Sequence, residues 1–211
     1  MAGEPRDFNA VAATWDENPG RAKLAGDIAR AIRETLQPGT ETDMLDFGCG
    51  TGLLSLALLP YVRSVIAVDS SEGMLRVLDA KIARLGSGAI RTALADLEKG
   101  DRLPGPVDLV TSSMTFHHLR DPVAVLTEMA RALRPGGRIA IADLDSDDGM
   151  FHDSPEGVFH NGFDRCTMQK YFEAAGFTAV RNRTAAVMHK TGADGRTRTF
   201  TVFLMTAAKK E

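Results

Sequence analysis

Short apolar runs alternate with amphipathic segments through the middle of the chain. Apolar runs typical of strands lie at residues 43–48, 64–69, 89–93, 107–112 and 137–142. Segments with apolar positions at helical spacing lie between them, at residues 52–59, 71–84 and 122–133. This alternation is typical of βα units, which build a parallel sheet with helices on both faces.

Residues that cap helices and make turns agree with these boundaries. Ser71 can cap one helix, and Asp121 followed by Pro122 places a cap and then a proline at the first helical position. The run Pro135-Gly136-Gly137 predicts a turn before the strand at 137–142.

Both flanks of this region are patterned as well. The segment before the first strand has apolar residues at helical spacing and predicts a helix across the site or the sheet: Leu24, Ile28, Ile32 and Leu36 within residues 20–36. A helix is expected near 167–175. Two further apolar-patterned runs, 177–188 and 198–207, are joined by residues 191–195 and predict a hairpin that closes the sheet.

The composition indicates one globular domain. The 211 residues are 44% hydrophobic and 25% charged, with a formal net charge of -3. This balance gives no basic field that would favour nucleic acid or anionic lipid, and no run reaches the roughly 18 apolar residues of a membrane span. Cys49 and Cys166 form neither a disulfide framework nor a metal-binding spacing. We therefore expect a soluble cytoplasmic protein without a metal, a nucleic-acid partner or a membrane partner.

A glycine-rich loop follows the first predicted strand and opens a helix. It reads Asp46-Phe47-Gly48-Cys49-Gly50-Thr51-Gly52, in which glycine lets the backbone turn sharply and approach a ligand. Asp69 ends the next predicted strand, where a carboxylate can accept hydrogen bonds from both hydroxyls of a ribose. Leu53 stands where a dinucleotide fingerprint has its third glycine. The negative charge of Asp46 suits a cationic cofactor better than a pyrophosphate.

These residues resemble the motifs of class I S-adenosylmethionine-dependent methyltransferases. The resemblance runs in family order over residues 45–142 through five segments: Leu45 to Gly52, Val68 to Leu75, Ala95-Asp96-Leu97-Glu98, Asp108-Leu109-Val110 with Phe116-His117-His118-Leu119, and Leu133 to Gly137. It implies a Rossmann-like α/β fold with a seven-stranded, mostly parallel sheet and an antiparallel last strand. It also implies a single methyltransferase domain over 1–211, with an N-terminal helical cap (1–42), a cofactor-binding half (43–142), and an acceptor-pocket segment with the hairpin (143–211).

The resemblance also implies a set of residues that bind S-adenosylmethionine. Gly48 and Gly50 would face the methionine part, Asp46 would act near its amino group, and Asp69 would bind the ribose. Asp96 and the Leu97 backbone would contact the adenine, with Met74 as an apolar wall. The full set of cofactor candidates is Trp15, Asp46, Gly48, Cys49, Gly50, Asp69, Ser70, Met74, Asp96 and Leu97. Trp15 is either a core plug or a lid, and Cys49 is interpreted as a small packed residue rather than a nucleophile.

Methyl transfer from a sulfonium is an in-line displacement, so holding the nucleophile in line supplies most of the catalysis. A base is needed for a hydroxyl or a protonated amine. His117 and His118 follow the fourth strand at the edge where the methyl should point, and His117 is favoured. His160 is a second candidate, in the segment between Phe151 and Phe163 that would shape the acceptor pocket.

The leading hypothesis is therefore a methyltransferase, monomeric or homodimeric, that acts on oxygen, nitrogen, sulfur or carbon of a small molecule. One alternative is an NAD(P)-dependent oxidoreductase, although the chain lacks the third glycine and a Tyr-x-x-x-Lys pair. Another is a non-catalytic protein that binds S-adenosylmethionine. Amino methylation of DNA is not expected, because residues 111–116 lack the Asn/Asp-Pro-Pro-aromatic signature.

Overall fold

The computed structural model describes residues 7–152, 154–191 and 195–210. Its elements in chain order are α1 (Phe8–Val11), η1 (Ala12–Glu17), α2 (Pro19–Leu36), β1 (Asp43–Phe47), α3 (Leu53–Leu58), η2 (Leu59–Tyr61), β2 (Ser64–Asp69), α4 (Glu72–Leu85), β3 (Ile90–Leu94), η3 (Leu97–Lys99), β4 (Val107–Ser113), η4 (Phe116–His118), α5 (Pro122–Ala132), β5 (Leu133–Leu144), α6 (Arg165–Ala174), β6 (Phe177–Thr191) and β7 (Thr197–Lys209). Within these residues no helix is long and apolar enough to cross a membrane.

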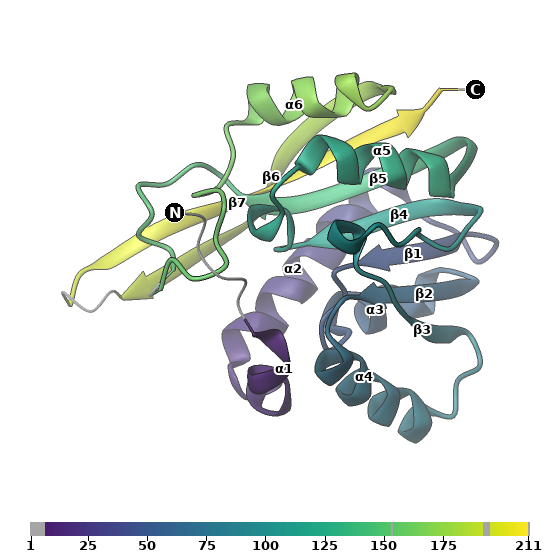
Figure 1. Ribbon diagram of the computed structural model, residues 1–211, viewed down its shortest axis with the longest axis horizontal. Coiled ribbons are helices and arrows are strands. Elements are labelled where there is room, and N and C mark those ends of the chain that lie inside the picture. The colour runs from purple at the N-terminus through teal and green to yellow at the C-terminus, as the bar shows by residue number, and fades with distance from the viewer. Residues whose placement is uncertain (1–6, 153, 192–194, 211) are drawn as a thin grey trace.

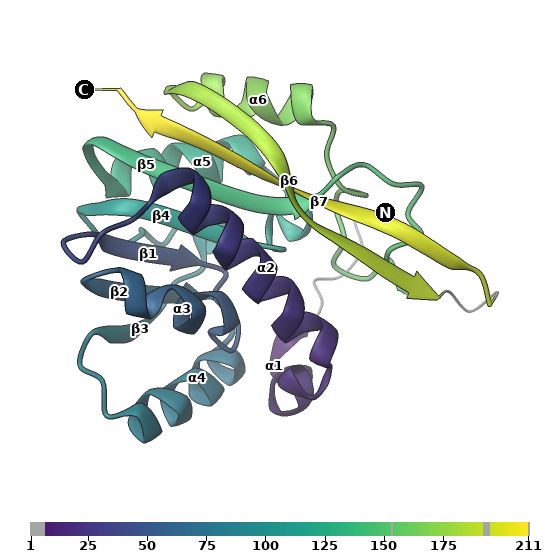
Figure 2. The same cartoon turned by 180° about the vertical axis from the view of Figure 1, so that it is seen from behind.

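The strands form one seven-stranded sheet in the order β3-β2-β1-β4-β5-β7-β6 (Figure 1). The first five strands pair in parallel, and β7 pairs antiparallel with both β5 and β6. The predicted fold, a mostly parallel sheet with an antiparallel last strand, is confirmed. The predicted hairpin is confirmed too, and both views show it reaching beyond the rest of the sheet (Figures 1 and 2). Residues 192–194 of its predicted connection lie outside the described residues.

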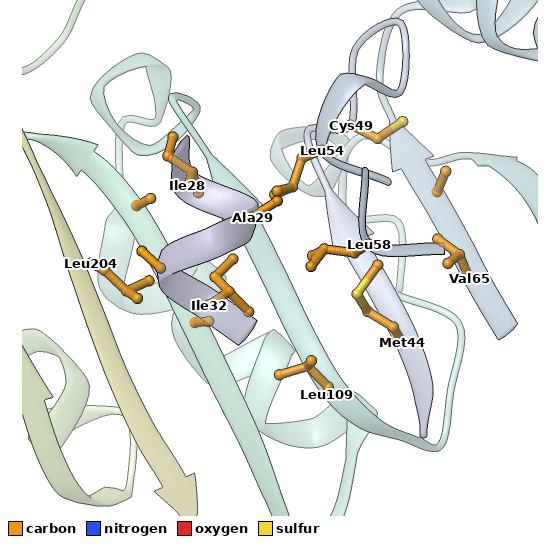
Figure 3. Close-up of a cluster of buried hydrophobic side chains, with 14 of the residues drawn as sticks. Ile28, Ala29, Ile32, Met44, Cys49, Leu54, Leu58, Val65, Leu109 and Leu204 are labelled. Carbon is orange, nitrogen blue, oxygen red and sulfur yellow. The ribbon is translucent and has the colours of Figure 1, made fainter. Parts of the chain in front are cut away.

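Helices cover both faces of the sheet, and strand residues alternate between the two cores. On one face Met44 and Leu109 pack with α2, α3 and α4, and Figure 3 shows this cluster around Ile28 and Ile32. On the other face the adjacent residues Leu45 and Val110 pack with α5 and α6. Because β1 and β4 are buried on both faces, the carboxyl edge of the sheet is the part that can hold a ligand.

Two helix caps are confirmed and one predicted turn is corrected. The Ser71 hydroxyl accepts a hydrogen bond from Met74 N, and the Asp121 carboxylate accepts one from Ala124 N. The turn predicted at residues 135–137 is instead an irregularity inside β5. Between two registered pairs, four residues of β5 (134–137) stand opposite one residue of β4, Asp108, and Gly136 takes a left-handed conformation with φ of 69°. The excess residues bulge out while pairing continues on both sides.

A charged network fastens the amino ends of β1 and β4. The Asp43 carboxylate accepts hydrogen bonds from Ser64 Oγ at 2.6 Å and from the guanidinium groups of Arg63 and Arg134. Arg134 also contacts Asp108 at 2.7 Å, and Asp108 accepts from the Asp43 amide. The hydrogen bonds from Arg63 and Ser64 hold the pKa of Asp43 well below its ordinary value.

We expect Asp43→Asn to lower the free energy of unfolding at pH 7 by about 1 kcal/mol, since this network is partly exposed. A depressed carboxyl pKa stabilises the fold above the unfolded value and loses that effect as the pH falls. The difference from the wild type should therefore shrink below about pH 4. Urea unfolding at pH 7 and pH 3 tests this, and an equal difference at both pH values would contradict it.

Candidate cofactor and acceptor site

The glycine loop leaves β1 through three left-handed glycines. The φ angles of Gly48, Gly50 and Gly52 are 66°, 54° and 81°. A side chain at Gly48 would strike Thr115, and one at Gly52 would strike Leu78, each at 2.3 Å. By contrast, a Cβ on Gly50 would have no described atom within 4 Å. The loop is therefore tightly packed at its two ends and open at its centre.

Asp69, at the end of β2, joins this loop to the next one. One oxygen accepts a hydrogen bond from Gly50 N at 2.8 Å, and the other accepts one from Ser71 N at 2.8 Å. Burial raises the pKa of Asp69, and the amides of Ser71 and Gly50 partly offset that shift. The carboxylate lies at the end of β2, as the sequence predicted, and its oxygens keep lone pairs for further donors.

Asp46 lies beneath the loop rather than on its open side. It is 1% exposed, and its oxygens accept hydrogen bonds from Ser55 Oγ at 2.5 Å and Thr111 Oγ1 at 2.9 Å. Burial raises its pKa to about 6. Asp46 therefore connects β1 to α3 and β4 and places a buried carboxyl at the start of the loop.

A cavity of about 430 Å³ opens beside the ends of β2 and β3. Its lining residues are Asn9, Ser70, Glu72, Arg76, Leu94, Asp96, Lys99 and Asp101. Ser70 and Asp96 were predicted from the sequence. Asn9 and Leu94 were not predicted. Leu94 ends β3 with 55% of its surface exposed, and only the structure shows this exposure. Met74 is buried in the first turn of α4, and Leu97 begins η3.

Two further cofactor candidates have clear environments. The Cys49 thiol is buried and contacts the Gly50 carbonyl oxygen at 3.6 Å. Burial, with the nearby charge of Asp69, raises the pKa of Cys49 well above its ordinary value, so the thiol stays protonated. Trp15 is only half-buried, with the Arg21 guanidinium 3.7 Å from its ring and the Phe8 ring at 6.0 Å. It is therefore not a core plug.

His117 forms a buried pair with a carboxylate that the sequence reasoning missed. Its Nδ1–H donates to Asp143 Oδ1 at 2.6 Å, and the two side chains are 2% and 0% exposed. Asp143 also accepts hydrogen bonds from Phe116 N and Leu144 N, both at 2.8 Å. Burial alone would raise the pKa of Asp143, but His117 and these amides hold it below its ordinary value. The bond to Nδ1 leaves Nε2 of His117 as the nitrogen that can accept a proton.

His118 and His160 fasten the segment between β5 and α6 onto η4. The Nδ1–H of His118 donates to Gly157 O at 2.6 Å, and burial lowers the pKa of His118 to about 4. The ring of His160 donates to Leu119 O at 3.0 Å. The His152 ring from the same segment lies 4.9 Å from that of His117. In the described ranges, no three acidic, histidine or cysteine side chains converge as metal ligands.

Comparison with known proteins agrees with this geometry. A family model described as "Methyltransferase domain" matches residues 45–141. The chain is 36% identical over 140 residues to a malonyl-[acyl-carrier protein] O-methyltransferase of Hahella chejuensis, covering 65% of this chain and 48% of that protein. It is 30% identical to a ubiquinone biosynthesis O-methyltransferase of Idiomarina loihiensis, with 65% and 58% covered. The crystal structure of the YcgJ protein from Bacillus subtilis superposes with a TM-score of 0.71 at 19% identity, covering 87% of this chain and 98% of that chain.

These findings confirm the resemblance to class I S-adenosylmethionine-dependent methyltransferases. The family match spans the stretch from β1 into β5 that contains the glycine loop, Asp69 and the histidine pair. The chain spans about half the length of the curated relatives it matches. The comparisons give no support to an NAD(P)-dependent oxidoreductase.

The buried carboxyl of Asp46 predicts a stability effect opposite in sign to that of Asp43. A raised carboxyl pKa favours the fold below the unfolded value, about 4, and this effect is lost as the pH rises through about 6. We expect Asp46→Asn to raise the free energy of unfolding at pH 8 by about 1 to 3 kcal/mol. The gain should vanish near pH 4 in urea unfolding. A variant less stable than the wild type at pH 8 would contradict this expectation.

Proposed function

We propose that this chain transfers a methyl group from S-adenosylmethionine to an oxygen of a small molecule. The observation that carries the proposal is Asp69, which accepts hydrogen bonds from the amides of Gly50 and Ser71 and directly precedes Ser70, a residue that lines the 430 Å³ cavity. The match to the methyltransferase family supports the chemistry. The names of the two O-methyltransferase relatives support oxygen as the methylated atom.

The residues at this edge fit the proposed cofactor in shape and in charge. The missing Cβ of Gly50 leaves open space over the loop, and Leu94 offers an apolar surface at the cavity wall. Asp46 and Asp69 place two carboxyls under and beside the loop. Such a negative field suits a ligand with an ammonium and a sulfonium. A pyrophosphate would be repelled there.

Each part of the site then has a role. Asp69 would accept hydrogen bonds from the ribose hydroxyls, Asp96 and the Leu97 backbone would contact the adenine, and the Gly48–Gly50 backbone would border the methionine part. Trp15 would cover the cofactor from outside. Asp46, which is held in place by the Ser55 and Thr111 hydroxyls, would stabilise the positive charge of the cofactor from below.

S-adenosylmethionine supplies the electrophilic methyl group, and the protein supplies position and a base. We propose His117 as that base, since Asp143 fixes its tautomer and leaves Nε2 to accept the hydroxyl proton. Asp143 stabilises the resulting imidazolium. His118, with its pKa of about 4, stays neutral at pH 7 and holds the segment between β5 and α6 through Gly157. Because His117 is 2% exposed, the acceptor must displace part of that segment to reach it.

Calorimetric titration with S-adenosylhomocysteine, NAD and NADP tests the cofactor. We expect saturable binding of S-adenosylhomocysteine alone, weakened about a hundredfold by Asp69→Ala, the scale of losing charge-assisted hydrogen bonds. Asp79→Ala is the matched control, because that exposed carboxylate on α4 bonds only Thr92 among the described contacts. Equal affinity of a folded Asp69→Ala variant, or binding of a nicotinamide nucleotide alone, would refute the assignment.

The base is tested by methyl transfer to a panel of phenols and catechols, with an aromatic thiol as a partner that ionises unaided. We expect His117→Gln to lower kcat for hydroxyl acceptors about a hundredfold or more and to leave thiol methylation nearly unchanged. Asp143→Asn should lower kcat and change its pH profile, whereas His160→Gln should affect neither strongly. Equal losses for hydroxyl and thiol acceptors would assign His117 a structural role.

A further inference from the structure

Residues 8–17, which form α1 and η1, lie against the cofactor loops rather than in the core. We call these residues the gate segment. Ala12 is its only buried residue. Both views show α1 beside the beginning of α4, outside the layers that sandwich the sheet (Figures 1 and 2). The segment is therefore held by local polar contacts more than by apolar packing.

One end of the gate segment is fastened to the glycine loop. Asp16 accepts a hydrogen bond from Thr51 Oγ1 at 2.6 Å and forms an ion pair with Lys81 Nζ at 2.5 Å. Lys81 also donates to the Thr51 carbonyl oxygen at 2.7 Å. The side chains of Lys81 and Asp16 are 24% and 34% exposed, so solvent screens this contact only in part.

The other end is fastened to the beginning of α4. Asn9 Oδ1 accepts hydrogen bonds from Gly73 N at 2.7 Å and from Ser71 Oγ at 2.9 Å. A Cβ on Gly73 would lie 2.9 Å from Asn9 Cα, so the glycine permits this close approach. Asn9 also lines the cavity with Ser70 and Asp96.

At its first residue, next to Asn9, the gate segment also contacts the histidine pair. The Phe8 ring lies 5.2 Å from His118, edge to face, and 6.0 Å from Trp15. One segment thus contacts the glycine loop, the ribose side of the cavity and η4. These are the proposed methionine, ribose and acceptor parts of the site.

We infer that the gate segment closes over S-adenosylmethionine and must open for the cofactor to enter and to leave, with the Asp16–Thr51–Lys81 cluster as its latch. This inference rests on the proposed cofactor site. The latch contacts join protein groups to each other and need no ligand, so they restrain the segment before binding as well as after it. A latch of this kind sets the rate of exchange more than the affinity.

Stopped-flow mixing with S-adenosylhomocysteine tests the gate on the full chain. Trp15 is the only tryptophan and lies in the gate segment, so its emission is the signal, with release of tritiated ligand measured in parallel. We expect Asp16→Ala and Lys81→Met each to raise both the association and the dissociation rate about fivefold or more, the scale of one partly buried ion pair. The Kd should change much less. The double variant should show little further increase, because both residues act through one latch.

Lys23→Met is the matched control, since Lys23 is 73% exposed and pairs with Asp27 within α2 at 2.6 Å, and it should leave both rates unchanged. A rise in the dissociation rate alone would show that the segment contacts the bound ligand without limiting its entry, and this would overturn the gate. Unchanged rates in folded variants that bind S-adenosylhomocysteine would overturn the gate alone. If the wild type binds no S-adenosylhomocysteine, the proposed cofactor fails and the gate fails with it.

Discussion

The site depends on two hydrogen bonds to one carboxylate. Asp69 accepts from the amide of Gly50 in the first loop and from the amide of Ser71 in the second, each at 2.8 Å. It thereby fixes the distance between two loops that come from neighbouring parallel strands. Parallel strands bring their carboxyl ends to one edge. Asp69, together with the hydrogen bond from Cys49 N to Val68 O at 3.0 Å, then holds the glycine loop against the end of β2.

Two other buried carboxylates at the same edge show how environment separates their roles. Asp46 is held mainly by the hydroxyls of Ser55 and Thr111, whose hydrogen bonds do not offset burial, so its pKa is raised to about 6. Asp143 is held by His117 and two backbone amides, which keep its pKa low. The first can respond to a cation bound above it, and the second can hold an imidazole in one tautomer. The raised pKa of Asp46 predicts that its buried charge costs stability at neutral pH, as is common for residues at functional sites.

The sequence predicts the features that depend on neighbours in the chain. The caps at Ser71 and Asp121 are local, and the strands and helices follow the apolar pattern closely. Asn9 and Asp143 escaped prediction because their partners are distant in sequence. Asn9 bonds Ser71 across 62 positions, and Asp143 bonds His117 across 26. No local pattern marks such pairs. Likewise, the bulge in β5 is defined by its pairing with β4, so the sequence Pro135-Gly136-Gly137 alone predicts a turn.

The arrangement of the covering elements couples the two halves of the proposed site. Phe8 of the gate segment contacts His118, and His118 donates to Gly157 of the segment between β5 and α6. That segment also meets His117 through its His152 ring and through the amide of Phe159. A movement of the gate segment or of the segment between β5 and α6 would therefore change the packing of the same histidine pair. The proposed opening of the gate segment would therefore also loosen the packing of His118, and a bound acceptor would favour its closure over the cofactor. Mutual support of this kind lets an active site exclude water only when both substrates are in place.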